Sequence, residues 1–290
     1  MRVGHRSLDP ATAVLTRSQP PRPQRVPFAL IERITTVLLE LTGKRALVTG
    51  ASRGIGKATA ELLAQEGCSL AICARGEKDL LGFADELRDR GVFVHAEAFD
   101  VSAESEVAAF VDRSAAALGG LDILISNVTA GSAKGDGQWA TSLATDLLPL
   151  VRAVDAAVPH FVTAGGGAVV ALSSVSGLDT ATPSAPNSYA AMKAAVIQHA
   201  SARAHALAAQ GIRVNTVSPG PTEFPGGDWD RVREGRPALY QQIKERIALG
   251  RYGRPEEIAK AVVYLASPAA SFCTGVNLVV DGGMLSRVQF

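Results

Sequence analysis

Two side chains that can exchange a proton, Tyr189 and Lys193, stand four residues apart in this chain. The segment around them, 188–209, is rich in helix-forming residues, so both side chains should project from one face of a helix. A phenol is a poor base at neutral pH, but a nearby ammonium group stabilises its phenolate form. The pair is therefore a candidate for general acid/base catalysis, with Tyr189 transferring the proton.

A glycine-rich loop, Thr-Gly-Ala-Ser-Arg-Gly-Ile-Gly at 49–56, follows the first predicted strand. In a tight turn from strand to helix, glycine lets the backbone approach a pyrophosphate that larger side chains would block. The helix that follows offers free N–H groups and a positive dipole. The loop predicts a dinucleotide site formed by Gly50, Ser52, Arg53, Gly54, Ile55 and Gly56.

The Thr-Gly-x-x-x-Gly-x-Gly loop and the Tyr-x-x-x-Lys pair resemble the short-chain dehydrogenase/reductase family, over roughly residues 41 to 285. The resemblance implies a single Rossmann-type, doubly wound α/β domain with a seven-stranded parallel sheet in the order 3-2-1-4-5-6-7. It also implies hydride transfer between a nicotinamide and a carbonyl or alcohol substrate. Tyr189 would then protonate the carbonyl oxygen during reduction, while Lys193 also binds the nicotinamide ribose.

The family places a substrate-orienting serine at the end of its fifth strand, where this chain reads Ser-Ser-Val-Ser at 173–176. Ser174 fits the end of the strand, and we assign it this role. Ser176 is the alternative, because it lies thirteen residues before Tyr189, which is the family's common interval. The segment 179–187, with two prolines, is typical of a loop that tolerates two extra residues, which favours Ser174.

The cofactor preference depends on the residues after the second strand, Cys73-Ala74-Arg75. Enzymes that prefer NAD place a carboxylate there to bind the ribose 2′-hydroxyl, and here Ala74 takes its place. Arg75 and Arg53 are planar cations suited to the 2′-phosphate of NADP. We therefore predict NADP(H), with two solvated surface arginines as the alternative interpretation.

Further positions resemble the family's cofactor contacts. Asp100 and Val101, after the third strand, match an adenine contact, although Asp100 could instead cap the next helix. Asn127 follows the fourth strand, and Thr222 stands where the family contacts the carboxamide. The other candidates are Pro219 and Gly220 in the same turn, together with Tyr189 and Lys193.

The chain departs from the family pattern at two places. Where the family reads Asn-Asn-Ala-Gly after the fourth strand, this chain reads Ser-Asn-Val-Thr at 126–129. Asp146, seven residues after Trp139, replaces an asparagine that helps hold a water relay to the lysine. A carboxylate near Lys193 could alter the pH optimum, so Asp146 is a candidate catalytic residue. The alternative is an exposed helix residue without a role.

The elements that must position these residues alternate, from residue 44 onward, between short apolar runs and helical segments, as in βαβ units. Near-continuous apolar character is typical of strands covered on both faces. The predicted strands are 46–49, 69–74, 93–98, 123–126, 168–173, 213–217 and 278–280, and helices are predicted over 56–65, 105–117, 188–209 and 255–266.

A polar stretch with three aromatic residues, Phe224, Trp229 and Tyr240, predicts a mobile substrate lid near 222–247. Packing of these aromatics into the core is the alternative. The C-terminal motifs of 250–257 and 273–283 also resemble the family, in which the last strand and helix build a homotetramer. We expect a homotetramer, or a dimer, on this resemblance.

Composition narrows the class of protein. A net charge of +1 disfavours nucleic-acid binding, and no apolar run approaches the length of about 18 residues that a membrane span needs. Three widely spaced cysteines suggest buried apolar residues rather than disulfides or zinc ligands, and the five histidines form no ligand cluster. We therefore expect a soluble, cytoplasmic protein without a metal site.

The first 36 residues carry six arginines, two acidic residues and five of the fifteen prolines. We expect 1–40 to be an N-terminal extension, either disordered or the product of a start codon assigned too far upstream. Its arginine-rich, acid-poor character also resembles an organelle transit peptide. The oxidoreductase domain should occupy 41–290.

Two other functions remain open beside a general NADP(H)-dependent oxidoreductase acting on a small carbonyl or alcohol. One is a 3-oxoacyl-thioester reductase, which the C-terminal motifs resemble. The other is a non-catalytic NADP-sensing protein, which the departures at 126–129 and Asp146 suggest. The complete set of Ser174, Tyr189 and Lys193 favours an enzyme.

Overall fold

The computed structural model describes residue 1 and residues 38–131, 134–180 and 187–286. The chain divides into Met1–Val37, which apart from Met1 lies outside the described residues, and a compact unit that begins at Leu38. The expectations for the N-terminal extension therefore fall almost wholly outside the described residues.

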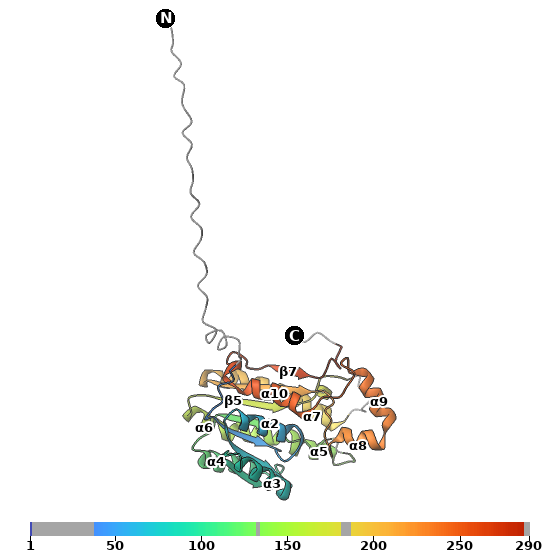
Figure 1. The fold of residues 1–290 in the computed structure, drawn as a ribbon, viewed down its shortest axis with the longest axis horizontal. Coiled ribbons are helices and arrows are strands. Elements are labelled where there is room, and N and C mark those ends of the chain that lie inside the picture. The colour runs from blue at the N-terminus through green and yellow to red at the C-terminus, as the bar shows by residue number, and fades with distance from the viewer. Residues whose placement is uncertain (2–37, 132–133, 181–186, 287–290) are drawn as a thin grey trace. The chain divides into compact units, whose positions relative to one another are not determined.

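A seven-stranded sheet forms the centre of the compact unit (Figure 1). Its order is β3-β2-β1-β4-β5-β6-β7, and every pairing is parallel. The strands are β1 (Arg45–Thr49), β2 (Ser69–Ala74), β3 (Val94–Ala98), β4 (Ile123–Ser126), β5 (Gly167–Leu172), β6 (Ile212–Pro219) and β7 (Asn277–Val280). The predicted Rossmann-type sheet and its order are confirmed.

Helices cover both faces of this sheet (Figure 1). They are α2 (Gly54–Gln65), α3 (Glu77–Arg88), α4 (Glu106–Leu118), α5 (Gln138–Ser142), α6 (Leu148–Thr163), α7 (Ser188–Leu207), α8 (Asp228–Gly235), α9 (Pro237–Arg246) and α10 (Pro255–Ala266). Single turns η1 (Leu143–Leu147), η2 (Val175–Gly177), η3 (Ala208–Gln210) and η4 (Pro268–Ala270) complete the chain.

The apolar core lies in two layers, one on each face of the sheet. Val48 packs in the layer that α2, α3 and α10 cover, whereas its neighbour Leu47 packs in the layer under α4, α6 and α7. Successive side chains of a strand point to opposite faces, so both residues are buried only when both faces are covered. This explains why the strands read as continuous apolar runs.

Element boundaries differ from the predicted ones by a few residues. Strand β6 continues to Pro219, because Ser218 and Pro219 pair with Val279 and Val280 of β7. Helix α2 begins at Gly54 rather than at residue 56, so the second glycine of the loop already belongs to the helix. Strand β5 ends at Leu172, which leaves Ser174 just beyond its carboxyl end.

Within the described ranges, no helix is long and apolar enough to cross a bilayer, and no three potential metal-ligating side chains converge on one point. Cys68 and Cys73 are buried, and burial raises the pKa of each thiol to about 12. Cys273 is partly exposed, so the expectation that all three cysteines are buried is wrong for this one.

Candidate active site

Tyr189 and Lys193 both lie in the first turns of α7. The helix begins with Asn187 as its cap, whose side-chain Oδ1 accepts a hydrogen bond of 3.0 Å from the N–H of Ala190. Lys193 Nζ lies 5.7 Å from the centroid of the Tyr189 ring. The structure thus brings the phenol and the ammonium group together on one helix face, as the spacing predicts.

The Lys193 side chain is almost completely buried, with 2% of its surface exposed. Its Nζ donates a hydrogen bond of 3.0 Å to the carbonyl of Leu172, the last residue of β5. The same Nζ lies 3.1 Å from Asp146 Oδ1, whose side chain is fully buried. The lysine is therefore held between the end of the strand and a carboxylate.

Asp146 is not the exposed helix residue that the sequence left open, so that alternative is wrong. It lies in η1, a π-helical turn between α5 and α6. Such turns insert an extra residue into a helix and occur often at functional sites. Asp146 Oδ1 accepts a hydrogen bond of 2.6 Å from the Thr129 hydroxyl, and Oδ2 accepts one of 3.3 Å from the N–H of Ala130.

Ser174 is buried directly after β5 and begins the turn η2. Its Oγ accepts a hydrogen bond of 3.1 Å from the N–H of Ser176. Ser173 Oγ donates a bond of 2.8 Å to the backbone carbonyl of Lys193, which ties this turn to α7. Ser176 thus contacts Ser174 through its backbone N–H. This contact does not decide which of the two serines orients the substrate.

Gly177 explains how closely the serine turn approaches α7, and sequence reasoning did not single it out. A Cβ at this position would lie 2.7 Å from the backbone nitrogen of Ala194. Only glycine therefore allows this packing without a shift of backbone. No motif signals this requirement, because the crowding atoms come from a segment seventeen residues away.

The glycine loop has the form that a phosphate group needs. Gly50 and Gly54 adopt left-handed backbone angles, with φ of +68° and +56°. A Cβ on Gly56 would lie 2.1 Å from the carbonyl oxygen of Gly50, so the turn cannot hold a larger residue without rearranging. The cap residue Arg53 makes no side-chain capping hydrogen bond, so its side chain does not occupy the first N–H groups of α2, which can donate to a phosphate. The loop therefore fits a dinucleotide.

Asn127 supports this loop from the neighbouring strand β4. Its Nδ2 donates hydrogen bonds of 3.1 Å to the carbonyls of Thr49 and Gly50, and its N–H donates one of 3.0 Å to Thr49 Oγ1. The sequence assigned the Asn127 side-chain amide to cofactor binding, and in the structure this amide is hydrogen-bonded to the glycine loop. Asn127 therefore stabilises the conformation of the loop.

The two candidate cations for a 2′-phosphate lie at the same end of the sheet as the loop. Arg75 is largely exposed, and its Nη1 lies 3.8 Å from Asp100 Oδ2.

Asp100 does not cap a helix, because α4 begins at Glu106. Its Oδ1 instead accepts a bond of 2.9 Å from the N–H of Ser102, which lowers the pKa of the Asp100 carboxyl. Val101 is buried beside it.

The turn after β6 is fixed by its own backbone. Gly220 donates a hydrogen bond of 2.9 Å to the carbonyl of Val280, and a Cβ on Gly220 would lie 2.7 Å from the Cα of Asp281. Thr222 is buried, and its hydroxyl donates a bond of 3.0 Å to the carbonyl of Gly220. Pro219 ends the strand, so all three candidates of this turn lie at the carboxyl edge of the sheet.

The predicted lid region contains α8 and α9, which lie at the end of the sheet to which the strand arrows point (Figure 1). Tyr240 stacks on Tyr252 with ring centroids 4.3 Å apart, and Trp229 packs against Tyr252 at 5.2 Å. These aromatics pack together with buried residues such as Ile243, so the packing alternative is confirmed for Trp229 and Tyr240.

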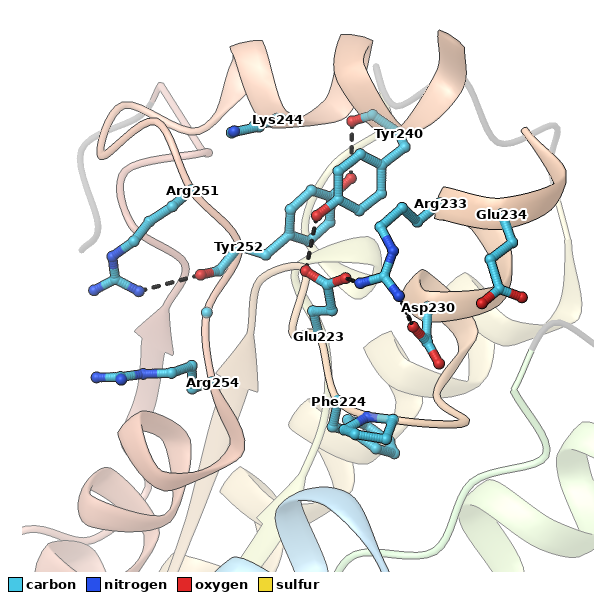
Figure 2. Close-up of a pocket in the computed structure, with 12 residues that line it drawn as sticks. Glu223, Phe224, Asp230, Arg233, Glu234, Tyr240, Lys244, Arg251, Tyr252 and Arg254 are labelled. Carbon is cyan, nitrogen blue, oxygen red and sulfur yellow. Dashed lines mark hydrogen bonds and ion pairs between the residues drawn. The ribbon is translucent and has the colours of Figure 1, made fainter. Parts of the chain in front are cut away.

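Polar contacts hold the lid region next to a pocket of about 620 Å³ (Figure 2). The Tyr240 hydroxyl donates a hydrogen bond of 2.7 Å to Glu223, and Arg233 forms ion pairs with Glu223 and Asp230. Burial and the bond to Glu223 raise the pKa of Tyr240 to about 12. Ser174, Tyr189 and Lys193 do not line this pocket, whose lining residues come from the segments 223–244 and 251–254.

Comparison with known proteins places this geometry in a family. Residues 50–285 match a family model described as enoyl-(acyl carrier protein) reductase. The chain belongs to the short-chain dehydrogenase/reductase family. It is therefore an oxidoreductase of the kind that acts on hydroxyl or carbonyl groups.

Several curated members of this family align with almost their full length. Isoepoxydon dehydrogenase patN of Penicillium expansum is 34% identical over 254 residues, covering 86% of this chain and 98% of the relative. Cis-4-hydroxycyclohexanecarboxylate dehydrogenase of Sinomonas cyclohexanicum is 39% identical over 247 residues, covering 82% and 95%. The 3-oxoacyl-[acyl-carrier-protein] reductase FabG of Vibrio cholerae is 36% identical over 255 residues, covering 85% and 99%.

Solved structures of short-chain dehydrogenases/reductases are similar over the same part of the chain. L-sorbose reductase from Gluconobacter frateurii, in complex with NADPH and L-sorbose, has a TM-score of 0.78 and 30% identity, covering 87% of this chain and 100% of its own. A 7α-hydroxysteroid dehydrogenase in complex with NADH and 7-oxo glycochenodeoxycholic acid has a TM-score of 0.78 and 28% identity, covering 87% and 98%. These family members bind nicotinamide cofactors of both kinds.

Proposed function

We propose that this protein is an NADP(H)-dependent oxidoreductase that transfers a hydride between nicotinamide and a small carbonyl or alcohol, with Tyr189 as the general acid/base. The observation that carries the proposal is the convergence at the end of β5. There the buried Lys193 Nζ lies 5.7 Å from the centroid of the Tyr189 ring and donates a hydrogen bond to the carbonyl of Leu172. Leu172 stands two residues before Ser174, so the three side chains lie near one another.

Each of these residues has a distinct role in reduction. Ser174 donates a hydrogen bond to the substrate oxygen and orients it. Tyr189 gives its phenolic proton to that oxygen, and Lys193 stabilises the phenolate that remains. The nicotinamide, when bound, supplies the hydride. In alcohol oxidation the same residues act in reverse, with Tyr189 accepting the proton.

The glycine loop at 50–56 supports the cofactor proposal, since its backbone leaves room for a pyrophosphate next to the start of α2. Preference for NADP rests on Arg75 and Arg53, together with Ala74 in the place of an acidic residue. Among the described residues, Arg75 forms one ion pair, a 3.8 Å contact to Asp100, and its side chain is 71% exposed, which leaves it available to a phosphate. By family resemblance we also propose a cytoplasmic homotetramer or dimer.

A 3-oxoacyl-thioester reductase is the second candidate. It is supported by the 36% identity to the FabG of Vibrio cholerae and by the description of the matching family model. The relative named for cis-4-hydroxycyclohexanecarboxylate, which is a ring alcohol, supports cyclic alcohols and ketones as substrates instead. The two candidates share the same chemistry at Tyr189 and differ in the substrate.

The test is NADPH oxidation, followed by absorbance, against a panel of cyclic ketones, diketones, keto sugars, steroids, quinones and oxoacyl thioesters. Tyr189→Phe is the matched control, because it removes only the phenolic hydroxyl. We expect turnover with at least one class and its loss in Tyr189→Phe, while fluorescence titration still detects NADPH binding. Tight NADPH binding without turnover on any compound would support the NADP-sensing alternative.

A further inference from the structure

The two places where the chain departs from its family pattern contact each other. Thr129 ends the segment that replaces Asn-Asn-Ala-Gly, and Asp146 replaces the family's asparagine. The Thr129 hydroxyl donates a hydrogen bond of 2.6 Å to Asp146 Oδ1. That same oxygen lies 3.1 Å from Lys193 Nζ. The departures are therefore one structural unit.

We propose that Thr129 is a positioning residue that acts through Asp146 on Lys193. Asp146 and Lys193 are buried, and the more exposed Thr129 completes a hydrogen-bonded network with them that holds the lysine where the family uses an asparagine. This proposal rests on the proposed function, because it assigns a role for Thr129 in the reaction that Tyr189 and Lys193 carry out.

The hydroxyl of Thr129 has a fixed direction. Its oxygen accepts a hydrogen bond of 3.1 Å from the N–H of Gly131, so its own hydrogen is directed to the Asp146 carboxylate. A hydroxyl that both accepts and donates strengthens each of its bonds, because each polarises the other. Glycine, the family residue at this position, has no side chain with which to do this.

Position 146 favours a carboxylate because, among the described residues, the polar groups that contact it are all donors. Thr129 and Lys193 donate to Oδ1, and the N–H of Ala130 donates to Oδ2. An asparagine could satisfy the first two with its carbonyl oxygen, but its NH₂ group would then face the N–H of Ala130. A buried carboxylate is in turn stable only when it is paired and fully hydrogen-bonded. Asp146 and Thr129 thus depend on each other.

The network leaves one donor of the lysine for the reaction. An ammonium group has three N–H donors, and Lys193 directs two of them to Leu172 and Asp146. The third remains for the side on which the Tyr189 ring lies. Without the bond from Thr129, the carboxylate loses a partner that restrains it, and the lysine is positioned less well.

The test compares Thr129→Val, which keeps the shape of the side chain without the hydroxyl, with Thr129→Ser, which keeps the hydroxyl. Thr163→Val is the matched control, because the Thr163 hydroxyl donates only to the Pro159 carbonyl on the surface of α6. With the best substrate of the panel, we expect Thr129→Val to lower kcat about tenfold, the effect of losing one charge-assisted hydrogen bond. Thr129→Ser and Thr163→Val should stay within about twofold of the parent protein.

A double-mutant cycle identifies the route through Asp146. Asp146→Ala, which removes the oxygen that accepts from Thr129, should lower kcat by at least as much as Thr129→Val, and the two substitutions combined should have less effect than the product of the two. Equal kcat in Thr129→Val and Thr129→Ser, or effects that multiply independently, would overturn the proposal. Thermal melting of each variant separates a folding defect from a positioning defect.

A second readout keeps this test independent of turnover. Titration of each variant with NADPH should show weaker binding for Thr129→Val than for Thr129→Ser, because Lys193 also binds the nicotinamide ribose in the proposed function. If the parent protein turns over no substrate, the proposed function fails. Identical NADPH affinity of the two Thr129 variants then overturns the positioning role, and a difference between them supports it.

Discussion

The ring of Phe224 lies against the backbone of Gly54, the second glycine of the cofactor loop. A Cβ on Gly54 would come within 2.6 Å of the Phe224 Cζ atom. The neighbouring Arg53 donates a hydrogen bond of 3.2 Å from Nη1 to the carbonyl of Gly226. The segment that leads into α8 therefore contacts the cofactor loop at two points.

Because of this contact, Phe224→Ala should weaken NADPH binding about fivefold, corresponding to the loss of about 1 kcal/mol of packing between the aromatic ring and the cofactor loop. Fluorescence titration measures the effect. Phe272→Ala is the control, since Phe272 is fully exposed and its removal should leave binding unchanged. Tighter binding in Phe224→Ala would mean that the ring occupies space that the cofactor needs.

Ser174→Ala should lower kcat/KM on the order of 10²-fold, the effect of removing one donor to the reacting oxygen. Ser176→Ala should leave kcat/KM nearly unchanged, because Ser176 contacts Ser174 through its backbone N–H, which the substitution keeps. Steady-state kinetics of both variants decides between the two serines. The reverse order of effects would assign the role to Ser176.

The sheet could be predicted from the sequence because its signal is local. Strands β1, β2, β4, β5 and β6 are runs of four to eight residues with buried side chains on both faces, and β1 illustrates this with Leu47 and Val48 in opposite core layers. Such a run needs no knowledge of distant residues. The same holds for Tyr189 and Lys193, whose separation along one helix fixes their relative placement.

The environment of Asp146 could not be predicted in the same way. The sequence indicated an added charge near Lys193, but the direct ion pair depends on a π-helical turn that no spacing rule signals. Its bond from Thr129 joins residues seventeen positions apart, one in the loop after β4 and the other in η1. The stacking of Tyr240 on Tyr252 is likewise a tertiary contact, and the polar composition of the segment around Tyr240 gave no indication of it.

Arg75→Ala should raise the KM for NADPH about tenfold or more and leave the KM for NADH unchanged. The loss corresponds to a charge-assisted bond to the 2′-phosphate, which only NADPH carries. Initial rates with both cofactors measure the effect. Arg90→Ala is a suitable control, since Arg90 pairs with Glu61 at 3.0 Å on the outer surface. An equal change for NADH and NADPH would contradict the assignment of Arg75.

Glu257 provides a stability test that is independent of catalysis. Its carboxylate accepts hydrogen bonds of 2.8 and 2.6 Å from the Arg251 guanidinium and one of 2.9 Å from the N–H of Arg254 at the start of α10. The bonds from Arg251, followed by that from Arg254, lower the pKa of Glu257 to about 2. Because the folded pKa lies below the unfolded value near 4.3, this stabilisation is present above about pH 4.3 and is lost as the pH falls through about 2.

Glu257→Gln should therefore lower Tm at pH 7 by about 2–4 °C, as expected for a helix-capping side chain that contributes about 1 kcal/mol. The difference from the parent protein should shrink as the pH falls from about 4.3 towards 2, because over this range Glu257 is protonated in the unfolded parent chain while it stays ionised in the folded one. Glu256→Gln removes the same charge from the same turn of α10, where the side chain is exposed, and should shift Tm less. Thermal melts of the three proteins at pH 7, 5 and 3 measure this. A constant difference between Glu257→Gln and the parent across that range would show that the ion pair with Arg251 does not contribute to folding.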